Sequence, residues 1–235
     1  MARILVVVTS ATEMGDSSRP TGIWLEEFTT PLYEFLDAGH EVTIASPAGG
    51  AVPVDPASLA EDAQTDSTRR FQADGAHRHL LEDAVPLRDV AMHDFDAVFY
   101  PGGHGPMWDL SRDETSAVLV SAFLEANKPV GAVCHGPAAF VPAKRADGTS
   151  VLANRHVTGF ANTEEEAVGL AKLVPFLLQD RLVSLGAQYS KGRDWGEHVV
   201  TDGQLVTGQN PASAGLAARR LMELLSPAEV SSPPA

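Results

Sequence analysis

The sequence of 235 residues contains one cysteine, Cys134. A single thiol cannot form an intramolecular disulfide, so the chain is not a disulfide-stapled secreted scaffold, and zinc sites built from several cysteines are excluded. Long hydrophobic runs are also missing. The apolar run 4–8 is too short for a signal peptide, and no stretch approaches the roughly 18 apolar residues that span a bilayer. We therefore expect a soluble cytoplasmic protein with no membrane partner.

Basic residues are scarce as well. The chain has 17 Lys and Arg against 31 Asp and Glu, a formal net charge of −14. A phosphate backbone or an anionic bilayer attracts a basic surface, so this balance argues against a nucleic-acid partner and against docking on acidic lipids. Hydrophobic residues make up 44% and charged residues 20% of the chain. This composition is typical of a globular protein with a full apolar core.

Short apolar runs that alternate with helical patterns predict an α/β fold. Such alternation builds a doubly wound, mostly parallel sheet, here a three-layer α/β/α sandwich of the flavodoxin-like type in a single domain over 1–225, with a frayed tail at 226–235. Pro31 should kink or break the first helix, and Ser58 should cap the second. Ligands of such sheets bind beyond the carboxyl ends of the strands. The expected strands are 4–8, 42–45, 96–100, 129–133, 157–160 and 204–208, and the expected helices are 21–38, 58–72, 112–127, 174 onward and 211–225.

Cys134 is the first candidate for chemistry. It directly follows the strand 129–133 and precedes His135 and Gly136, so the sequence predicts a tight strand-to-helix turn that exposes the thiol above the sheet, a relative of the nucleophile elbow. The amides of the following helix should lower the pKa of the thiol. A lone cysteine is more often buried and inert, but this position favours a nucleophile.

Other candidates surround the same edge of the sheet. The sequence leaves three roles possible for His135: a base, an orienting group or a residue without a function in the site. The glycines of the loop 101–106 could turn N–H groups inward as an oxyanion cradle, with an ordinary loop as the alternative. Glu26 or Glu27 should face the ligand edge with a raised pKa and be protonated at neutral pH. In the acidic run 164–166, which opens a helix, two of the three carboxylates are expected to be solvated. No His-x-x-x-His pair with a third carboxylate appears, so we expect no metal site.

Several separated motifs together resemble one family. They are similar to the ThiJ/PfpI superfamily, whose fold is like that of class I glutamine amidotransferase domains, and in particular to its glyoxalase III and heat-shock chaperone-like branch. The similarity covers nearly the whole chain, about 4–225. The segments that carry it occur in a fixed order: TGIWLEE from Thr21, YPGGHG from Tyr100, AVCHGP from Ala132, VTGF from Val157 and VTGQNPASA from Val206.

The resemblance implies a set of site residues. Cys134 matches the nucleophile, His135 its neighbouring histidine, and Glu27 the helix-borne glutamate that contacts the sulfur. The acidic residue that orients the histidine falls on Glu165, with its neighbours at 164 and 166 as alternatives after a one-residue shift. The oxyanion and substrate-binding positions fall on Gly103, His104 and Gly136.

The resemblance also implies a reaction. Such an enzyme is a cofactor-free, glutathione-independent lyase that converts methylglyoxal and other α-ketoaldehydes to D-lactate and other 2-hydroxy acids through a hemithioacetal on Cys134, with the amides of Gly103 and Cys134 holding the oxyanion. Protein deglycase activity is an additional option, and a homodimer is implied. The metal site of larger bacterial chaperone members is not transferred. Holding-chaperone, amidotransferase-like and peptidase-like functions stay open, since a fold does not fix a function.

Overall fold

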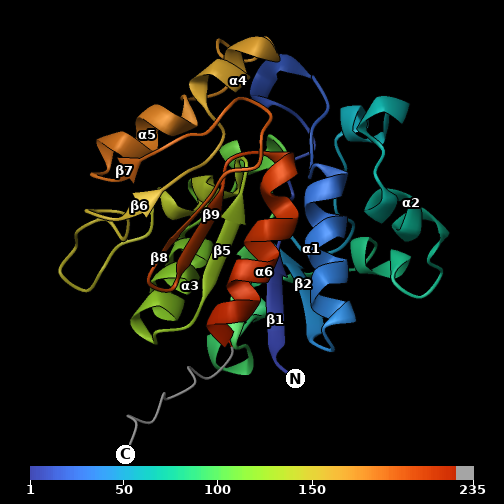
Figure 1. Cartoon of the computed structure of the whole chain (residues 1–235), viewed down its shortest axis with the longest axis horizontal. Coiled ribbons are helices and arrows are strands. Elements are labelled where there is room, and N and C mark those ends of the chain that lie inside the picture. Colours follow the sequence, from blue (N-terminus) through green and yellow to red (C-terminus); the bar gives the residue numbers. More distant parts are fainter. Residues whose placement is uncertain (226–235) are drawn as a thin grey trace, which may run out of the picture.

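A computed structural model describes residues 1–225, so the predicted frayed tail, 226–235, lies outside the described residues. The central element is a seven-stranded sheet with the strand order β3-β2-β1-β4-β5-β9-β8 (Figure 1). Neighbouring strands run parallel except for β8 and β9, which are antiparallel. The strands of this sheet are β1 (Arg3–Val7), β2 (Glu41–Ser46), β3 (Val85–Pro86), β4 (Ala97–Tyr100), β5 (Val130–Val133), β8 (Val199–Asp202) and β9 (Leu205–Gly208).

Helices cover both faces of the sheet. Helices α1 and α6 pack side by side on one face (Figure 1). Helix α3 lies on the other face, because right-handed crossovers that leave β1 and β4 in opposite directions reach opposite faces. This layered arrangement around a mostly parallel sheet confirms the predicted fold class. The helices are α1 (Leu25–Asp37), α2 (Asp66–Ala73), α3 (Glu114–Glu125), α4 (Asn162–Ala167), α5 (Leu178–Ser184) and α6 (Ala214–Leu225).

The apolar strands form the core, as their continuous hydrophobic sequences predict. Residues 4–7 of β1 expose at most 2% of their surface, because helices cover both of their sides. Phe35 of α1 meets Phe99 of β4 edge to face, with ring centroids 5.8 Å apart. A small parallel pair, β6 (His156–Val157) and β7 (Gln188–Tyr189), stands apart from the main sheet. Helix α4 lies beyond the carboxyl ends of the central strands (Figure 1), where the functional candidates gather.

Two predicted helices differ from the structure. Helix α1 continues through Pro31, so the predicted break is wrong. Proline removes the hydrogen bond to the carbonyl four residues earlier and crowds that carbonyl, but the buried apolar face of α1 keeps the helix on the sheet. The segment 58–72 is not one helix: two 3₁₀ turns, Pro56–Leu59 and Glu61–Ala63, precede α2. The caps are the side chains of Asp55 and Thr65 rather than Ser58, which is itself buried.

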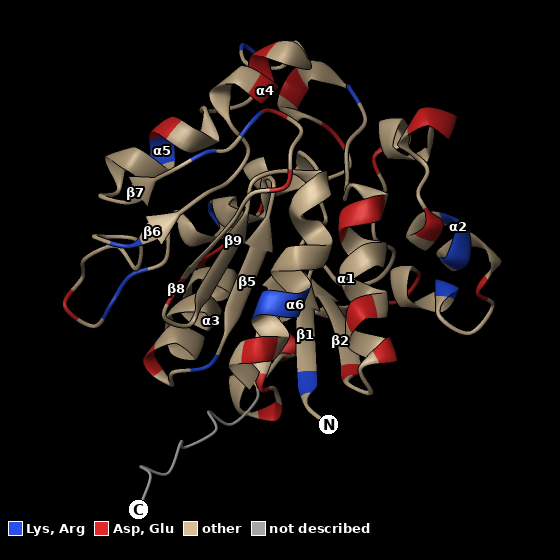
Figure 2. Ribbon diagram, viewed as in Figure 1, with Lys and Arg blue, Asp and Glu red and all other residues tan. Residues whose placement is uncertain are grey.

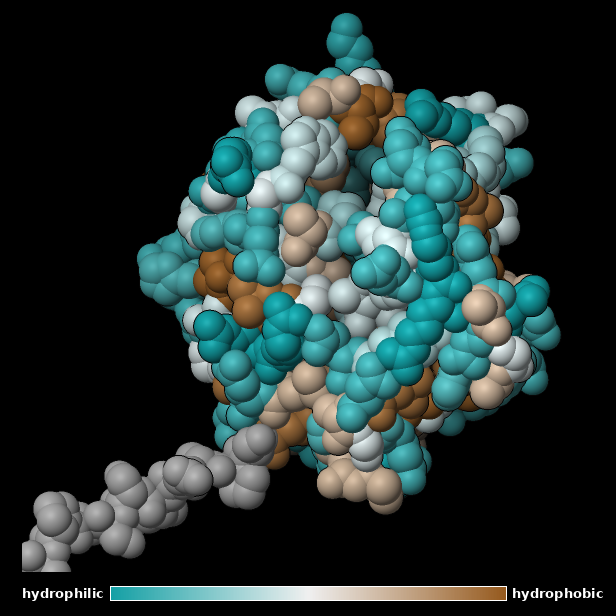
Figure 3. Space-filling model, turned by 45° about the vertical axis from the view of Figure 1, so that its right-hand side comes forward, coloured by the Kyte–Doolittle hydropathy of each residue, from teal (hydrophilic) through white to brown (hydrophobic). Residues whose placement is uncertain are grey.

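The surface reflects the acidic composition. Acidic residues occur on α1, α4 and α6, and basic residues are scattered along the chain (Figure 2), although Glu164 and Glu165 of α4 are buried. On the face drawn in Figure 3, hydrophilic side chains dominate and hydrophobic ones form small separate patches. Among residues 1–225, no helix has the length and apolar character needed to cross a membrane.

Candidate active site

Cys134 occupies a strained position at the carboxyl end of β5. Its φ of 58° is a left-handed conformation that costs a non-glycine residue about 1–3 kcal/mol and that clusters at functional sites. Two hydrogen bonds hold it there: the Cys134 N–H donates to Gly208 O at 3.0 Å, and the Phe160 N–H donates to Cys134 O at 2.9 Å. The residue exposes only 4% of its surface. The fold therefore fixes the thiol in one orientation above the sheet.

Glu27 approaches the sulfur from the first turn of α1. It is fully buried, and its Oε2 accepts a hydrogen bond from the Gly102 N–H at 2.8 Å. Its Oε1 is buried and receives no N–H or O–H donor from the described residues. Burial raises the pKa of Glu27 well above its ordinary value, although contacts with Cys134 and Gly102 act in the opposite direction. A protonated Glu27 carboxyl group can donate to the sulfur that its side chain contacts.

The predicted depression of the Cys134 pKa is wrong. Burial raises the pKa of this thiol, and the neighbouring Glu27 carboxylate raises it further, while the Gly103 N–H acts in the opposite direction. The turn after the elbow is a short 3₁₀ segment, Gly136–Phe140, so no α-helix amide terminus stands behind the sulfur. Burial thus raises the pKa of both Glu27 and Cys134, so each of these two acids favours its protonated form.

His135 links the sulfur to Glu165. Its Nδ1 lies 3.3 Å from Cys134 Sγ, and its Nε2 lies 2.7 Å from Glu165 Oε2. Burial alone would raise the pKa of Glu165, but the imidazoles of His135 and His104 lower it below the ordinary range. Burial, with a smaller effect of His104, lowers the pKa of His135. The ionised Glu165 therefore keeps the imidazole proton on Nε2, which leaves the Nδ1 lone pair directed at the thiol.

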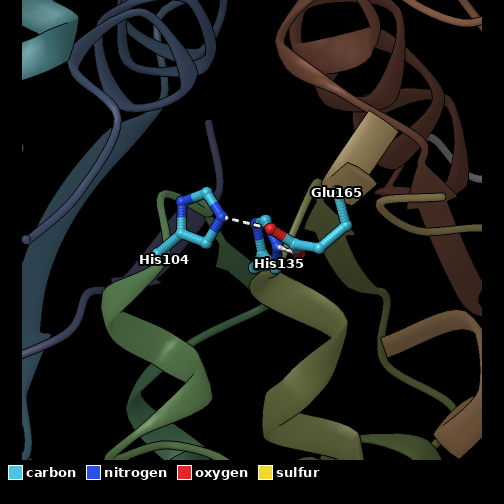
Figure 4. A group of neighbouring side chains, drawn as sticks. All are labelled: His104, His135 and Glu165. Carbon is cyan, nitrogen blue, oxygen red and sulfur yellow. Dashed lines mark hydrogen bonds and ion pairs between the residues drawn. The ribbon is translucent and has the colours of Figure 1, made fainter. Parts of the chain in front are cut away.

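His104 is a second imidazole on the same carboxylate. Its Nε2 lies 2.8 Å from Glu165 Oε1, and its ring lies on that of His135 with centroids 4.1 Å apart (Figure 4). The sequence placed His104 among the oxyanion and substrate-binding positions but gave no sign of this pairing. Its side chain is 11% exposed, so His104 is the most exposed of the three residues.

The acidic run on α4 is less solvated than predicted. Glu164 and Glu165 are both buried, and only Glu166 is exposed. Glu164 Oε2 accepts from the Ala161 N–H at 3.1 Å, and its Oε1 accepts from the Trp195 N–H at 2.8 Å. Glu164 thus caps α4 and ties it to the loop that carries Trp195. Its position at the third residue of the helix, where a glutamate commonly caps, was the available sequence signal.

The glycines of the site permit close backbone packing. Gly103 has a φ of +84°, and a Cβ there would collide with Gly22 O and Trp24 N. A Cβ on Gly136 would collide with Tyr100 O, so Gly136 lets the elbow pack against the end of β4.

One predicted oxyanion donor is already used. The Cys134 N–H donates to Gly208 O, so the expectation that it binds an oxyanion is wrong. The amide that follows Cys134, that of His135, has no hydrogen-bond acceptor within residues 1–225. The Gly103 amide contacts the sulfur. The amides of His135 and Gly103 are therefore the two donors that this site offers to an oxyanion.

Two aromatic side chains, Phe160 and Trp195, form a wall beside the histidines. Neither was among the site residues predicted from the sequence. Phe160 stacks on His135 with ring centroids 4.4 Å apart and an interplanar angle of 34°. Trp195 meets Phe160 edge to face at 5.8 Å. Trp195 exposes 50% of its surface, so the wall runs from the buried imidazole to the solvent. The VTGF motif that ends at Phe160 was the available signal.

Comparison with known proteins identifies this arrangement. The sequence pattern of the DJ-1/PfpI family matches residues 21–224. The chain belongs to the DJ-1/PfpI family. The glutathione-independent glyoxalase HSP31 of Saccharomyces cerevisiae is 28% identical over 233 residues, which cover 95% of this chain and 98% of the yeast protein. The glutathione-independent glyoxalase hsp3101 of Schizosaccharomyces pombe is 30% identical over 204 residues, 83% of each chain.

Solved structures agree with this DJ-1/PfpI membership. The Rapid Encystment Protein 24 KDa of Francisella tularensis has a TM-score of 0.92 at 37% identity and covers 97% of this chain and 100% of its own. Glyoxalase III of Candida albicans has the same fold, with a TM-score of 0.89 at 24% identity over 96% of this chain and 98% of its own. The predicted ThiJ/PfpI resemblance is therefore confirmed.

This DJ-1/PfpI site assembles a group of possible metal ligands that the sequence did not reveal. His104, His135 and Glu165 each offer one ligand atom, and these atoms lie within 4.8 Å of one another. The expectation that no ligand cluster exists is wrong, because it looked for ligands spaced along one helix. The three residues instead come from the loop after β4, the elbow after β5 and helix α4.

The raised pKa of Glu27 predicts a pH-dependent stability. The folded protein holds a proton on Glu27 that the unfolded chain loses above about pH 4.3. Unfolding therefore becomes more favourable as the pH rises toward the folded-state pKa, by up to about 1.4 kcal/mol per pH unit. Because Glu27→Gln removes this titration and keeps both hydrogen-bonding groups, we expect its Tm to rise relative to wild type between about pH 5 and pH 7.

Calorimetry of both proteins at several pH values measures this difference. The matched control is Glu166→Gln, because the Glu166 carboxylate is exposed on α4. The Tm difference between this variant and wild type should not change with pH. A Tm difference between Glu27→Gln and wild type that does not change with pH would show that Glu27 is ionised in the folded protein.

Proposed function

We propose that this protein is a glutathione-independent glyoxalase of the glyoxalase III type, which converts α-ketoaldehydes such as methylglyoxal to 2-hydroxy acids such as D-lactate. The observation that carries the proposal is one buried sulfur with a carboxyl group on one side and a carboxylate-oriented imidazole on the other. The names of the yeast relatives, which cover most of the chain, support the same reaction.

The reaction begins with the thiol. His135 Nδ1 accepts the Cys134 proton, and the sulfur forms a bond to the aldehyde carbon of methylglyoxal. The carbonyl π electrons move to oxygen, which takes up a proton, and the product is a hemithioacetal. The amides of Gly103 and His135 stabilise the negative charge on that oxygen while it develops. The internal thiol has the role that free glutathione has in glutathione-dependent chemistry.

The second stage moves hydrogen between two carbons. A base, Glu27 or His135, removes the proton from the former aldehyde carbon, and the resulting enediol is reprotonated on the neighbouring carbon. The product is a lactoyl thioester of Cys134. Water then attacks the thioester carbonyl, lactate leaves and the thiol is regenerated, so that methylglyoxal and water give lactic acid. The raised pKa of Glu27, caused by its burial, keeps a proton on its carboxyl group that can be transferred.

A direct assay tests this function. The protein, treated with a chelator and dialysed free of small thiols, should convert methylglyoxal to lactate, with both compounds quantified by chromatography. We expect turnover without added metal or glutathione, because Cys134, Glu27 and His135 supply the nucleophile and the proton transfers. Turnover that appears only after metal or glutathione is restored would refute the proposal.

A holding chaperone is less well supported. Such a protein needs contiguous exposed apolar surface, whereas the exposed large hydrophobic side chains within residues 1–225 lie on separate elements. They are Met1, Leu59, Val118, Val168, Val183 and Trp195. Amidotransferase-like, peptidase-like and deglycase activities use the same nucleophile, and the assay separates them by product: ammonia from glutamine, cleaved peptide, or amine released from a glycated protein.

We also propose a homodimer, from the family resemblance, and keep the cytoplasmic location that the sequence composition led us to expect. An apolar groove of about 420 Å³ lies between α3 and the segment 87–92, with Val118 exposed at its edge. This groove offers one surface for pairing. Light scattering at micromolar concentration should give twice the monomer mass of 24.9 kDa. The monomer mass itself would reject the dimer.

A further inference from the structure

Two imidazoles converge on one carboxylate at the carboxyl edge of the sheet (Figure 4). The Nε2 atoms of His104 and His135 lie 2.8 Å and 2.7 Å from separate oxygens of Glu165, and the three ligand atoms lie within 4.8 Å of one another. In a tetrahedral zinc site, with bonds of about 2.0–2.2 Å, ligand atoms lie roughly 3.3 Å apart. Small side-chain rotations would therefore let one ion contact all three residues.

We propose that His104, His135 and Glu165 form a reversible, inhibitory binding site for a divalent transition-metal ion of the Zn²⁺ class. Two imidazole nitrogens and one carboxylate oxygen are a donor set of open zinc sites, whereas Ca²⁺ and Mg²⁺ prefer oxygen ligands. His135 is fully buried and Glu165 is 2% exposed, so little water competes for these atoms. His104, with 11% of its side chain exposed, is the most exposed of the three, so a fourth, exchangeable ligand would approach from its side.

The surrounding contacts favour a single ion held at Nε2. Phe160 packs against His135 with ring centroids 4.4 Å apart, so the small rotations that bring the ligand atoms together fall to His104 and Glu165. Cys134 Sγ lies 3.3 Å from the opposite nitrogen, Nδ1. The sulfur is therefore on the far edge of the imidazole and is a partner of the ligand rather than a ligand itself, as is usual for groups that orient metal-binding histidines.

The inhibition follows from the tautomer of His135. An imidazole binds a metal through an unprotonated Nε2, so the ring proton of neutral His135 moves to Nδ1. Nδ1 then donates toward Cys134 Sγ and can no longer accept the thiol proton. This consequence rests on the proposed function, in which His135 Nδ1 takes that proton, whereas the binding itself does not depend on any activity.

Co²⁺ serves as the probe because its visible spectrum reports geometry. Titration of the chelator-treated full-length protein should give one equivalent of bound Co²⁺ with the visible bands of a four-coordinate site, and Zn²⁺ should displace it. No sulfur-to-cobalt charge-transfer band should appear in the near ultraviolet, since Cys134 is not a ligand. His104→Gln should weaken Co²⁺ binding by at least about 10²-fold, more than the loss of an outer-shell partner.

The matched control is His79→Gln, an exposed histidine outside the cluster, which should bind Co²⁺ as wild type does. Circular dichroism verifies that each variant is folded, and Glu165→Gln provides a second test of the ligand set. Wild-type affinity in folded His104→Gln and Glu165→Gln, or a thiolate charge-transfer band, would overturn the site.

The activity measurement is a separate arm. Zn²⁺ at saturation should lower methylglyoxal turnover by at least about tenfold, and a chelator should restore it. Unchanged turnover with Zn²⁺ bound would overturn the inhibition. A protein that never turns over methylglyoxal would refute the proposed function, and the Co²⁺ spectra would still decide whether the site exists.

Discussion

Replacement of Cys134 by alanine is expected to lower the rate of lactate formation from methylglyoxal by at least about 10³-fold, because the covalent bond to the aldehyde cannot form without the sulfur. The remaining groups, Glu27 and His135, would act on a free substrate that nothing holds at the elbow. The measurement is lactate production by chelator-treated protein in the absence of glutathione.

Cys134→Ser is the companion variant. Serine keeps a side chain of similar size at the strained elbow, where φ is 58°, so it separates loss of the nucleophile from disturbance of the turn. We expect it to fold with an unchanged circular dichroism spectrum and to be as inactive as Cys134→Ala, since its hydroxyl is a much weaker acid than a thiol. Turnover that survives in either variant would disprove the hemithioacetal mechanism.

Replacement of Glu27 by glutamine is expected to reduce turnover by about 10²–10⁴-fold, the usual contribution of a group that transfers protons. Glutamine is nearly isosteric with a protonated glutamate. Its Oε1 can accept from the Gly102 N–H, as the Glu27 carboxyl does, and its amide can donate to the sulfur. What it cannot do is release and recover a proton.

Glu26→Gln is the matched control, because Glu26 precedes Glu27 on α1 and is only partly buried. Its turnover should stay within a few-fold of wild type. Cys134 in Glu27→Gln should still react with iodoacetamide, which shows that the thiol is present and accessible. Full turnover of the Glu27→Gln variant would assign the transfer between the two carbons to His135 alone.

The sequence by itself determined the layer architecture and the place of Cys134, the proposed nucleophile. Short, continuous, largely β-branched runs such as 4–8 favour buried strands of a helix-covered sheet, and Cys134 directly follows another such run. These are short-range patterns, and burial of the same residues in the structure is their direct consequence. The separated motifs were enough to identify the DJ-1/PfpI family, because several matches in the right order are specific where one is not.

Only the tertiary structure decided the electrostatics of the site. The pKa of Cys134 depends on burial and on Glu27, which α1 brings from a distant part of the chain. The local pattern suggested helix amides instead, but the segment that follows is a 3₁₀ turn. The choice between Glu164 and Glu165 was equally beyond the sequence. Successive residues of a helix point in different directions, so Glu165 meets the two imidazoles while Glu164 caps α4.

The pairing of His104 with His135 has the same origin. Parallel strands end at one edge of the sheet, and the loops after β4 and β5 therefore place two histidines from separate motifs on a single carboxylate. The spacing of residues in the sequence reveals a cluster of interacting side chains only when one helix or one loop carries all of them. Here three elements contribute one residue each, so the cluster exists only once the sheet has formed and its carboxyl ends have been brought together.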